Sequence, residues 1–199
     1  MKKIVFATNN HHKLEEVRAK LKGSFEVVGL QEIGCFDDIP ETANTLEGNA
    51  LLKAKYISEK FGIDCFADDT GLEVAALDGA PGVDSALFAG EIRDAKKNMQ
   101  KVLDLMQGKQ NREACFRSVI TLIKNGEIIY FEGKVCGRIA ESPAGSAGFG
   151  YDPIFIPDGY DKSFAELSLE EKNCISHRAL AVEKLVEYLE ARGKSLKTK

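Results

Sequence analysis

The sequence has no tryptophan, only three histidines, and no C-x-x-C pair among its five cysteines. Widely separated cysteines without such a pair argue against a disulfide framework and against a thiolate zinc site, so we expect all five to be reduced thiols. Two of the histidines, His11 and His12, are adjacent, and adjacent side chains of a helix do not face each other. They make a poor chelate, which argues against a histidine metal site.

Positive charge and long apolar runs are also lacking. The 27 Lys and Arg residues are outnumbered by 31 Asp and Glu residues, which gives a formal net charge of -4. No global positive field therefore attracts a nucleic-acid polymer or an acidic membrane surface. No run approaches the roughly 18 apolar residues that a membrane span requires. We expect a cytoplasmic protein that binds neither polymeric nucleic acid nor a membrane.

The chain length of 199 residues and the hydrophobic fraction of 44% fit one domain with a sizeable core, or two small lobes. Helical and extended hydrophobic patterns alternate along the chain, which favours the α/β class. Strands are expected at residues 3–7, 26–30, 65–67 and 72–77, and helices at residues 13–21, 45–61, 94–106 and 177–192. Gly62 and Gly193 are expected to end two of these helices.

The second half of the chain contains a hairpin signal and a segment rich in helix and strand breakers. Asn125-Gly126 joins two β-rich stretches, and we expect this hairpin region, about residues 112–140, in a second lobe. Residues 142–161 hold too many glycines and prolines for an ordinary connector, which indicates a structured functional loop or a linker. The four aromatic residues of this segment favour the structured alternative.

Asp68 and Asp69 lie between two extended stretches, where Thr70-Gly71 predicts a turn. A carboxylate pair at the end of a buried strand suits a hard cation such as Mg²⁺, which prefers oxygen ligands and keeps several waters. Glu41 could supply a third carboxylate. A solvated turn without a ligand is the alternative.

The loop between the first strand and the first helix, together with the first helical residue, contains Thr8, Asn9, Asn10 and Lys13. The backbone N–H groups of a helix N-terminus, a hydroxyl, an amide and an ammonium could converge there on phosphate oxygens. Neither a P-loop nor a G-x-G-x-x-G motif is present. The alternative is that Thr8 and Asn10 only cap the helix.

Two later segments carry groups suited to recognising a base. Phe149 lies between two glycines, so its ring could stand clear of the backbone and stack on a base, or it could anchor the core. Lys172, His177 and Arg178 lie before or at the start of the last helix and could donate hydrogen bonds to a carbonyl acceptor. Cations are unfavourable at a helix N-terminus, which points to an acceptor or anion nearby, although ordinary capping is the simpler explanation.

Six short motifs occur in order along the chain, and together they are far more specific than any one of them. They read Thr8-Asn9-Asn10-x-x-Lys13-x-x-Glu16, Glu47-x-Asn49-Ala50-x-x-Lys53-Ala54, Ala67-Asp68-Asp69-Thr70-Gly71-Leu72, Gly79-Ala80-Pro81-Gly82, Phe149-Gly150-Tyr151-Asp152-Pro153 and Glu171-Lys172-x-x-x-Ser176-His177-Arg178. With these motifs the chain, from about residue 3 to residue 190, resembles the inosine/xanthosine triphosphate pyrophosphatase family.

The resemblance implies a fold and an activity. The family hydrolyses deaminated purine nucleoside triphosphates, such as ITP, dITP and XTP, to the monophosphate and pyrophosphate with Mg²⁺, and so keeps them out of DNA and RNA. The implied fold is a single ITPase-like domain over residues 1–199, with a long central mixed sheet flanked by helices. Two lobes with the active-site cleft between them, and a homodimer, are also implied.

The resemblance also assigns roles to individual residues. It implies that Glu41 and Asp69 bind Mg²⁺ with Asp68 nearby, and that Asp69 accepts the proton of the attacking water. The residues it implies for substrate binding are Thr8, Asn9, Asn10, Lys13 and Lys53 at the triphosphate end, and Thr70, Phe149, Gly150, Tyr151, Asp152, Lys172, His177 and Arg178 around the ribose and base.

Two positions depart from the family pattern. Asn9 stands where the first motif usually has Gly, and Leu87 stands where an Arg is common. These departures keep a second hypothesis open, a nucleotide sensor without catalysis, although the Asp68-Asp69 pair argues against a pure binding protein. A third hypothesis is a pyrophosphatase for other modified nucleotides, including pyrimidines.

Overall fold

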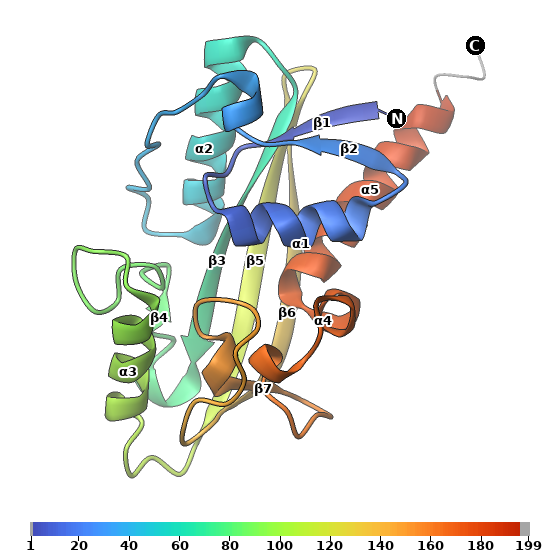
Figure 1. The fold of residues 1–199 in the computed structure, drawn as a ribbon. Helices are drawn as coiled ribbons and strands as arrows, with labels where there is room; N and C mark the ends of the chain where they lie inside the picture. The colour runs from blue at the N-terminus through green and yellow to red at the C-terminus, as the bar shows by residue number, and fades with distance from the viewer. Residues whose placement is uncertain (1, 196–199) are drawn as a thin grey trace. The chain divides into compact units, whose positions relative to one another are not determined.

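The computed structural model describes residues 2–195, with side chains through Arg192, and divides the chain into two compact units. Unit 1 contains the chain up to Asp69, Ser118–Gly133 and the stretch from Arg178 onward. Unit 2 contains Thr70–Arg117 and Lys134–His177. Helices and strands alternate along the chain, so the α/β class is confirmed (Figure 1). No helix in the described part of the chain is long and apolar enough to span a membrane.

The strands form one mixed sheet, as the sequence analysis expected. The strands are β1 (Lys2–Phe6), β2 (Phe25–Val28), β3 (Cys65–Val74), β4 (Pro81–Gly82), β5 (Glu113–Lys124), β6 (Glu127–Ile139) and β7 (Phe155–Pro157). Their order is β2-β1-β3-β5-β6-β7, and β4 pairs with β3. β1 is parallel to both β2 and β3, whereas β4 and β7 are antiparallel to their neighbours. The long strands β3, β5 and β6 each contribute residues to both units.

Three long helices cover the unit 1 part of the sheet. They are α1 (His11–Leu21), α2 (Leu46–Phe61) and α5 (His177–Ser195). Successive side chains of a strand point to opposite faces, and β5 shows this pattern. Ile120 and Leu122 pack in one core cluster with residues of α1 and α5, whereas Ile123 packs in another with residues of α2. The sheet is therefore covered on both faces in unit 1.

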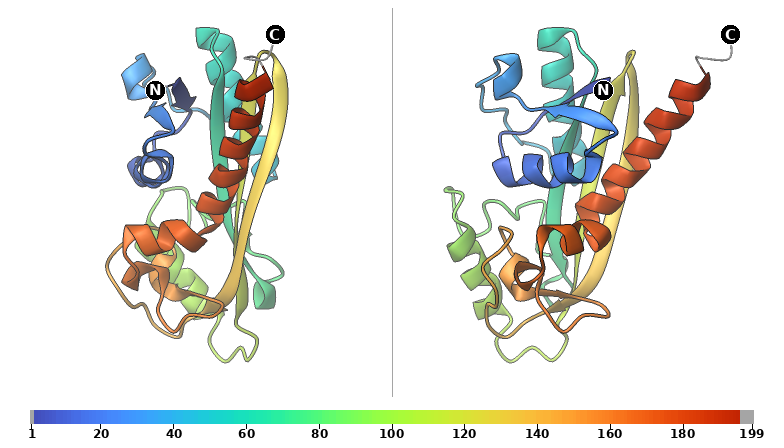
Figure 2. Two further views of the ribbon diagram at one scale, coloured as in Figure 1. Left: turned by 90° about the vertical axis from the view of Figure 1, so that its right-hand side faces the viewer. Right: turned by 45° about the vertical axis from the view of Figure 1, so that its right-hand side comes forward.

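Local capping explains where the helices of unit 1 begin and end. Asn10 caps α1 by accepting a hydrogen bond from the backbone N–H of Lys13, so this helix begins two residues before its expected start. Thr45 caps α2, and Gly62 ends it in the left-handed region with φ of 65°. Gly193 was expected to end the last helix, but α5 continues to Ser195 (Figure 2). An isolated glycine costs only about 1 kcal/mol inside a helix, which does not suffice to end it.

Unit 2 has its own helices and core. The helices are α3 (Ala95–Leu105) and α4 (Leu169–Ile175), and short 3-10 turns precede and follow β7. Asp94 caps α3, and Ser168 with Glu171 forms a capping box at the start of α4. The segment 142–161 is structured, because Tyr151 and Phe155 are buried in the unit 2 core. The aromatic residues therefore predicted the order of this segment correctly.

The hairpin expected around Asn125-Gly126 is confirmed, with both turn residues in the left-handed region. Its two strands are divided between the units. The part next to the turn, Ser118–Gly133, belongs to unit 1, and the start of β5 and the end of β6 belong to unit 2.

The cysteine prediction was wrong for one pair, because the structure joins Cys115 and Cys136 by a disulfide. Each cysteine lies nine residues from the turn end of its strand, so the two-residue turn places them directly across the hairpin with their Cα atoms 4.0 Å apart. Cys35, Cys65 and Cys174 are free thiols, as expected. Combining the turn with the cysteine positions would have found the pair.

The turn predicted at Asp68–Gly71 was also wrong, because β3 runs without interruption from Cys65 to Val74. A strand tolerates buried carboxylates when cations compensate them, and both aspartates have such partners. Gly71 is needed for a different reason: a Cβ added there would lie 2.4 Å from the backbone oxygen of Gly82. Close approach of β4, rather than a turn, accounts for this glycine.

We therefore expect Gly71→Ala to destabilise the protein by about 3 kcal/mol, because the opposing backbone must move. Urea unfolding measures the loss. Gly108→Ala is the matched control, since nothing lies within 4 Å of its added Cβ and only the positive φ of 72° is strained. Its expected cost is about 1 kcal/mol. Equal losses in the two variants would contradict the packing explanation.

Candidate functional site

Adjacent residues of a strand point to opposite faces, and β3 separates the partners of Asp68 and Asp69 accordingly. Asp68 contacts the Nζ of Lys13 and the Nε of Arg178, each at 2.9 Å. Asp69 instead lies near residues of α2. Both carboxylates are buried, with 1% and 6% of their surface exposed. The two aspartates therefore serve different clusters in unit 1 and do not form a chelating pair.

The Asp68 cluster is a buried network of charges. The guanidinium of Arg178 donates to Asp68 and to Glu16 of α1, and the hydroxyl of Ser118 in β5 donates to Asp68 at 3.5 Å. Burial alone would raise the pKa of Asp68, but Lys13 and Arg178 outweigh burial and hold this pKa well below its usual value. Asp68 is therefore ionised at neutral pH and fixes both cations in place.

The Asp69 cluster joins β3 to α2 and to the segment that precedes it. Asn49 and Lys53 lie one helical turn apart on the same face of α2. The Asn49 amide donates to Asp69 at 3.2 Å, and the Lys53 ammonium lies 3.6 Å from Asp69 and 2.8 Å from Glu41. Burial, with Glu41 and Asp68 nearby, raises the pKa of Asp69 although Lys53 opposes this. A carboxylate with a raised pKa is a stronger base than an ordinary aspartate.

The carboxylates of Glu41 and Asp69 fit a hard divalent cation. The Lys53 ammonium contacts the carboxylates of both Glu41 and Asp69. The two carboxylates therefore lie close enough to share one cation. Mg²⁺ commonly uses one or two carboxylates and completes its shell with water and substrate phosphates. No set of three or more His, Cys, Asp or Glu side chains arranged for a metal occurs among residues 2–192. This donor set therefore suits Mg²⁺ held together with a nucleotide better than a permanent all-protein site.

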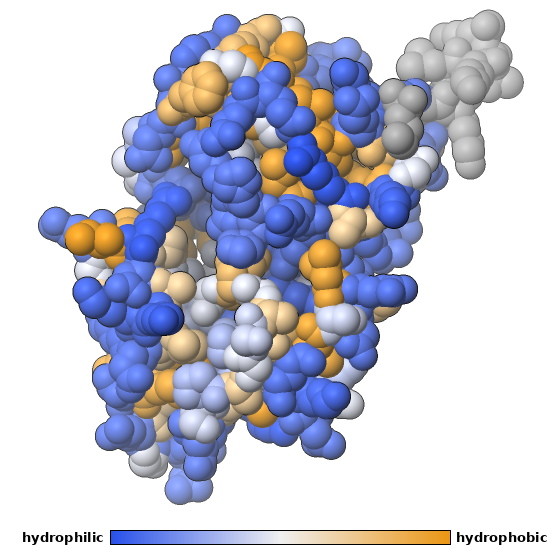
Figure 3. Space-filling model, in the orientation of Figure 1, coloured by the Kyte–Doolittle hydropathy of each residue, from blue (hydrophilic) through white to orange (hydrophobic). Residues whose placement is uncertain are grey.

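The histidines at the start of α1 play no part in these clusters. His11 and His12 are exposed, and the face of unit 1 that carries α1 is largely hydrophilic (Figure 3).

The loop between β1 and α1 holds the remaining residues expected at the triphosphate. Thr8 accepts a hydrogen bond from the backbone N–H of Asn10 at 3.2 Å, and the side-chain oxygen of Asn10 caps α1. Asn10 therefore caps α1, and its role at the triphosphate stays a prediction. Asn9 donates to the backbone oxygen of Asp37 at 3.0 Å. Lys13 extends from the first turn of α1, and one of its three N–H groups donates a hydrogen bond to Asp68.

Unit 2 brings together three of the residues expected at the base, Phe149, Asp152 and Lys172. Asp152 accepts hydrogen bonds from the backbone N–H of Phe149 at 2.8 Å and from the Lys172 ammonium at 2.6 Å. The same ammonium lies 5.1 Å from the centre of the Phe149 ring. Gly148 is required here, because a Cβ would lie 2.1 Å from the Asp152 carboxylate and its φ is 70°. Phe149 is half-buried, and its stacking on a base stays a prediction.

Other residues of this set are packed into the unit 2 core. The Tyr151 hydroxyl donates to the backbone oxygen of Ser85 at 2.7 Å, and burial raises its pKa. The His177 ring is buried and stacks on Phe116 with ring centres 4.6 Å apart. Gly150 has a φ of 63° and completes the turn that presents Phe149. Thr70 follows Asp69 in β3 and is half-buried.

Sequence reasoning gave no role to two buried residues of unit 1, Glu16 and Asn49. Glu16 belongs to the first motif and lies three positions after Lys13 on α1, so helical spacing already placed both on one face. Asn49 lies one turn before Lys53 on the buried face of α2. A polar residue within an apolar helix stripe is the signal that could have identified Asn49.

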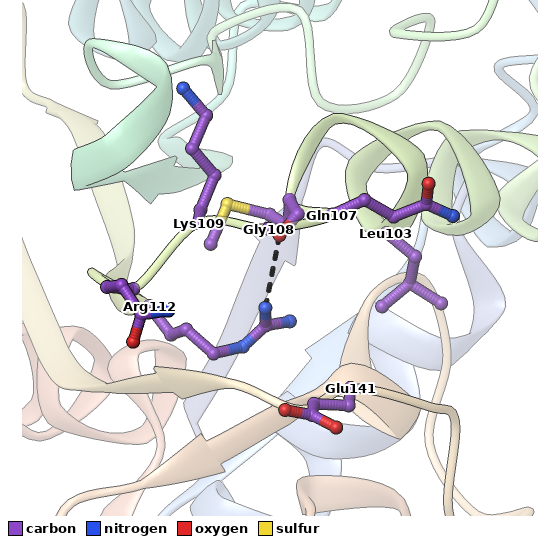
Figure 4. A pocket seen from close by; sticks show the side chains of 8 residues that line it. Leu103, Gln107, Gly108, Lys109, Arg112 and Glu141 are labelled. Carbon is purple, nitrogen blue, oxygen red and sulfur yellow. Dashed lines mark hydrogen bonds between the residues drawn. The ribbon is translucent and has the colours of Figure 1, made fainter.

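A separate hollow of about 390 Å³ lies in unit 2 at the end of α3 (Figure 4). None of the residues predicted to bind substrate or metal lines it. The Arg112 guanidinium there donates to the backbone oxygens of Met106, Ile139 and Ala140. Arg112 therefore ties the end of α3 to the end of β6, which is a structural role.

Comparison with known proteins identifies the family. A model of the Ham1 family matches residues 4–188. The chain belongs to the Ham1 family. A protein of Porphyromonas gingivalis named dITP/XTP pyrophosphatase is 57% identical over 190 residues, which cover 95% of this chain and 98% of that protein. A protein of the same name from Flavobacterium johnsoniae is 52% identical over 189 residues, which cover 95% and 98%.

Solved structures of Ham1 proteins share the fold. The Staphylococcus aureus Ham1 protein is 39% identical, with a TM-score of 0.86 over 96% of this chain and 100% of that one. A Ham1 protein from Coxiella burnetii is 38% identical with a TM-score of 0.86 over 96% and 100%. The resemblance inferred from the six motifs, and the fold class that it implied, are therefore confirmed.

Proposed function

We propose that this Ham1 protein hydrolyses ITP, dITP and XTP to the monophosphate and pyrophosphate, and so removes deaminated purines from the nucleotide pool. The observation that carries the proposal is the pair of β3 aspartates, each buried against its own lysine, in a chain whose relatives at 57% and 52% identity are named dITP/XTP pyrophosphatase. A water-activating carboxylate has no use in a protein that only binds nucleotide, so catalysis is favoured over sensing.

Unit 1 carries the groups that this reaction requires at the phosphates. The ammonium groups of Lys13 and Lys53 bind the polyphosphate, and the loop residues Thr8 and Asn10 present the N-terminus of α1 to it. Glu41 and Asp69 hold Mg²⁺, which, when bound, neutralises charge on the phosphates. Asp69 accepts the proton of the water that attacks the α-phosphorus, and pyrophosphate leaves. The position of Asp69 beside Lys53, which also contacts Glu41, supports this role.

Unit 2 carries the groups that select the base. Phe149 stacks on the purine, and the cationic and ring N–H donors of Lys172 and His177 serve a carbonyl acceptor such as the purine 6-oxygen. Adenine presents an amino group at that position and leaves buried donors unpaired. Such a mismatch rejects an analogue by about 10⁴ to 10⁵.

A panel of nucleotides tests the proposal. We expect kcat/KM for ITP, dITP and XTP to exceed the value for ATP by about 10⁴, because adenine leaves the buried donors unpaired. Binding of XTP without turnover would favour the sensor instead. Comparable turnover of pyrimidine triphosphates would favour a pyrophosphatase for other modified nucleotides.

Phe149→Ala separates stacking from a purely structural role. We expect the affinity for XTP to fall by about 1 to 3 kcal/mol, because one base–aromatic contact is lost. Calorimetric titration with a non-hydrolysable XTP analogue measures it. Tyr130→Ala, which removes an exposed aromatic residue of β6, is the matched control and should bind normally. Equal affinity of the Phe149 variant and the control would exclude stacking.

We also propose that the protein requires Mg²⁺ and works as a homodimer in the cytoplasm. The oxygen donors of Glu41 and Asp69 support the metal, whereas the family resemblance supports the dimer. Turnover with EDTA and with added Mg²⁺ tests the first point. Molar mass measured by light scattering during gel filtration tests the second.

A further inference from the structure

Asn9, the residue that departs from the first family motif, connects two segments that are far apart in the sequence. Its side chain is exposed in the loop between β1 and α1. Its amide nitrogen donates to the backbone oxygen of Asp37 at 3.0 Å, across 28 positions of the chain. A glycine at this position would have no group to make this contact.

Asp37 is itself fixed to α2. Its carboxylate accepts hydrogen bonds from the Tyr56 hydroxyl at 2.8 Å and from the Lys60 ammonium, and the Cys35 thiol lies 3.5 Å away. These donors lower the pKa of Asp37, which stays ionised at neutral pH. These contacts hold the backbone at Asp37 in place, and the hydrogen bond from Asn9 connects the β1–α1 loop to it.

Glu41 lies four residues beyond Asp37, on a segment without helix or strand. Residues 35–43 have no regular secondary structure, so side chains and caps must hold the segment in place. The backbone N–H of Ala43 donates to Asn49 at 2.9 Å, and Glu41 itself pairs with Lys53 at 2.8 Å. Asp37 is the fixed point at the other end. The position of Glu41 therefore depends on anchors at both ends of the segment.

We propose that Asn9 is a positioning residue: it ties the phosphate-binding loop to the segment that carries Glu41 and so sets the distance between that carboxylate and the Lys13–Lys53 cations. This inference rests on the proposed function for its consequence in catalysis, but the link itself does not. Asn9 then acts through Glu41 rather than by a side-chain contact with the nucleotide.

Asn9→Ala tests the link without adding charge, and alanine fits because Asn9 does not have a positive φ. By hydrogen–deuterium exchange we expect the amides of residues 37–43 to exchange about fivefold faster, the size of one lost hydrogen bond, while α2 keeps its protection. The Mg²⁺ concentration for half-maximal turnover should rise about fivefold. KM for XTP at saturating Mg²⁺ should not change.

Tyr56→Phe provides an independent variant, because it removes the hydroxyl that anchors Asp37 and leaves Asn9 intact. It should accelerate exchange of the same residues and raise the Mg²⁺ requirement. Tyr130→Phe, at an exposed tyrosine, is the matched control and should do neither.

Unchanged exchange of residues 37–43 in Asn9→Ala would overturn the proposal. So would a higher KM for XTP with an unchanged Mg²⁺ requirement, since that result places Asn9 on the substrate. If the wild-type protein turned over no deaminated nucleotide, the proposed function would fail, while the exchange measurement would still decide whether Asn9 fixes the segment.

Discussion

Asp69→Asn is expected to lower kcat for XTP by about two orders of magnitude or more, because it removes both a metal ligand and the proton acceptor. The substitution keeps the size of the side chain and leaves an oxygen for the Asn49 amide, so the fold should persist. Nucleotide affinity should remain largely in place, since Lys13 and the unit 2 residues are unchanged. Steady-state kinetics and calorimetric titration with a non-hydrolysable analogue separate the two effects.

The control for this prediction is Asp161→Asn, which removes the same charge from an exposed residue of unit 2. Its kcat should equal that of the wild type. Turnover by the Asp69 variant at the wild-type rate would remove this residue from catalysis and leave the β3 aspartates with a structural role only.

Asp68→Asn is expected to act on stability rather than on chemistry alone. Asp68 is 1% exposed and balances two cations, the buried Arg178 and the partly buried Lys13. Removing one partner of a buried charge pair leaves an uncompensated charge and costs about 3 to 5 kcal/mol. Urea unfolding at neutral pH measures the loss, and Asp161→Asn again serves as the control. A loss no greater than that of the control would show that the network adds nothing to stability.

The pH dependence of this loss has a definite sign. The pKa of Asp68 is lower in the folded protein than in the unfolded chain, where it is about 3.9. Its contribution to stability is therefore complete above about pH 5 and disappears as the pH falls through the folded-state pKa. The stability difference between wild type and Asp68→Asn should stay constant from pH 8 to about pH 5 and shrink only in stronger acid. If the stability difference between the two proteins already shrinks between pH 8 and pH 6, the pH dependence belongs to a group other than Asp68.

Local signals predicted much of the fold. Thr45 and Gly62 bound α2 because a side-chain cap and a left-handed glycine act within a few residues. Asn125-Gly126 determined the hairpin for the same reason. Six motifs in order identified the family and with it the activity of its named relatives.

Local signals could not predict which buried carboxylate is balanced by a cation from a distant part of the sequence. Asp68 and Arg178 are 110 positions apart, so nothing in the local sequence shows that a cation stabilises a carboxylate inside a strand. Local composition therefore suggested a turn at Asp68–Gly71, where β3 in fact continues. The backbone of Gly82 that explains Gly71 is likewise visible only in the folded chain.

The isotope content of the products tests the central claim most directly. XTP hydrolysed in water enriched in ¹⁸O should give XMP that carries the label and pyrophosphate that carries none, because the activated water attacks the α-phosphorus. Mass spectrometry of both products reads the result. Release of XDP with labelled inorganic phosphate, or label in the pyrophosphate, would contradict the account.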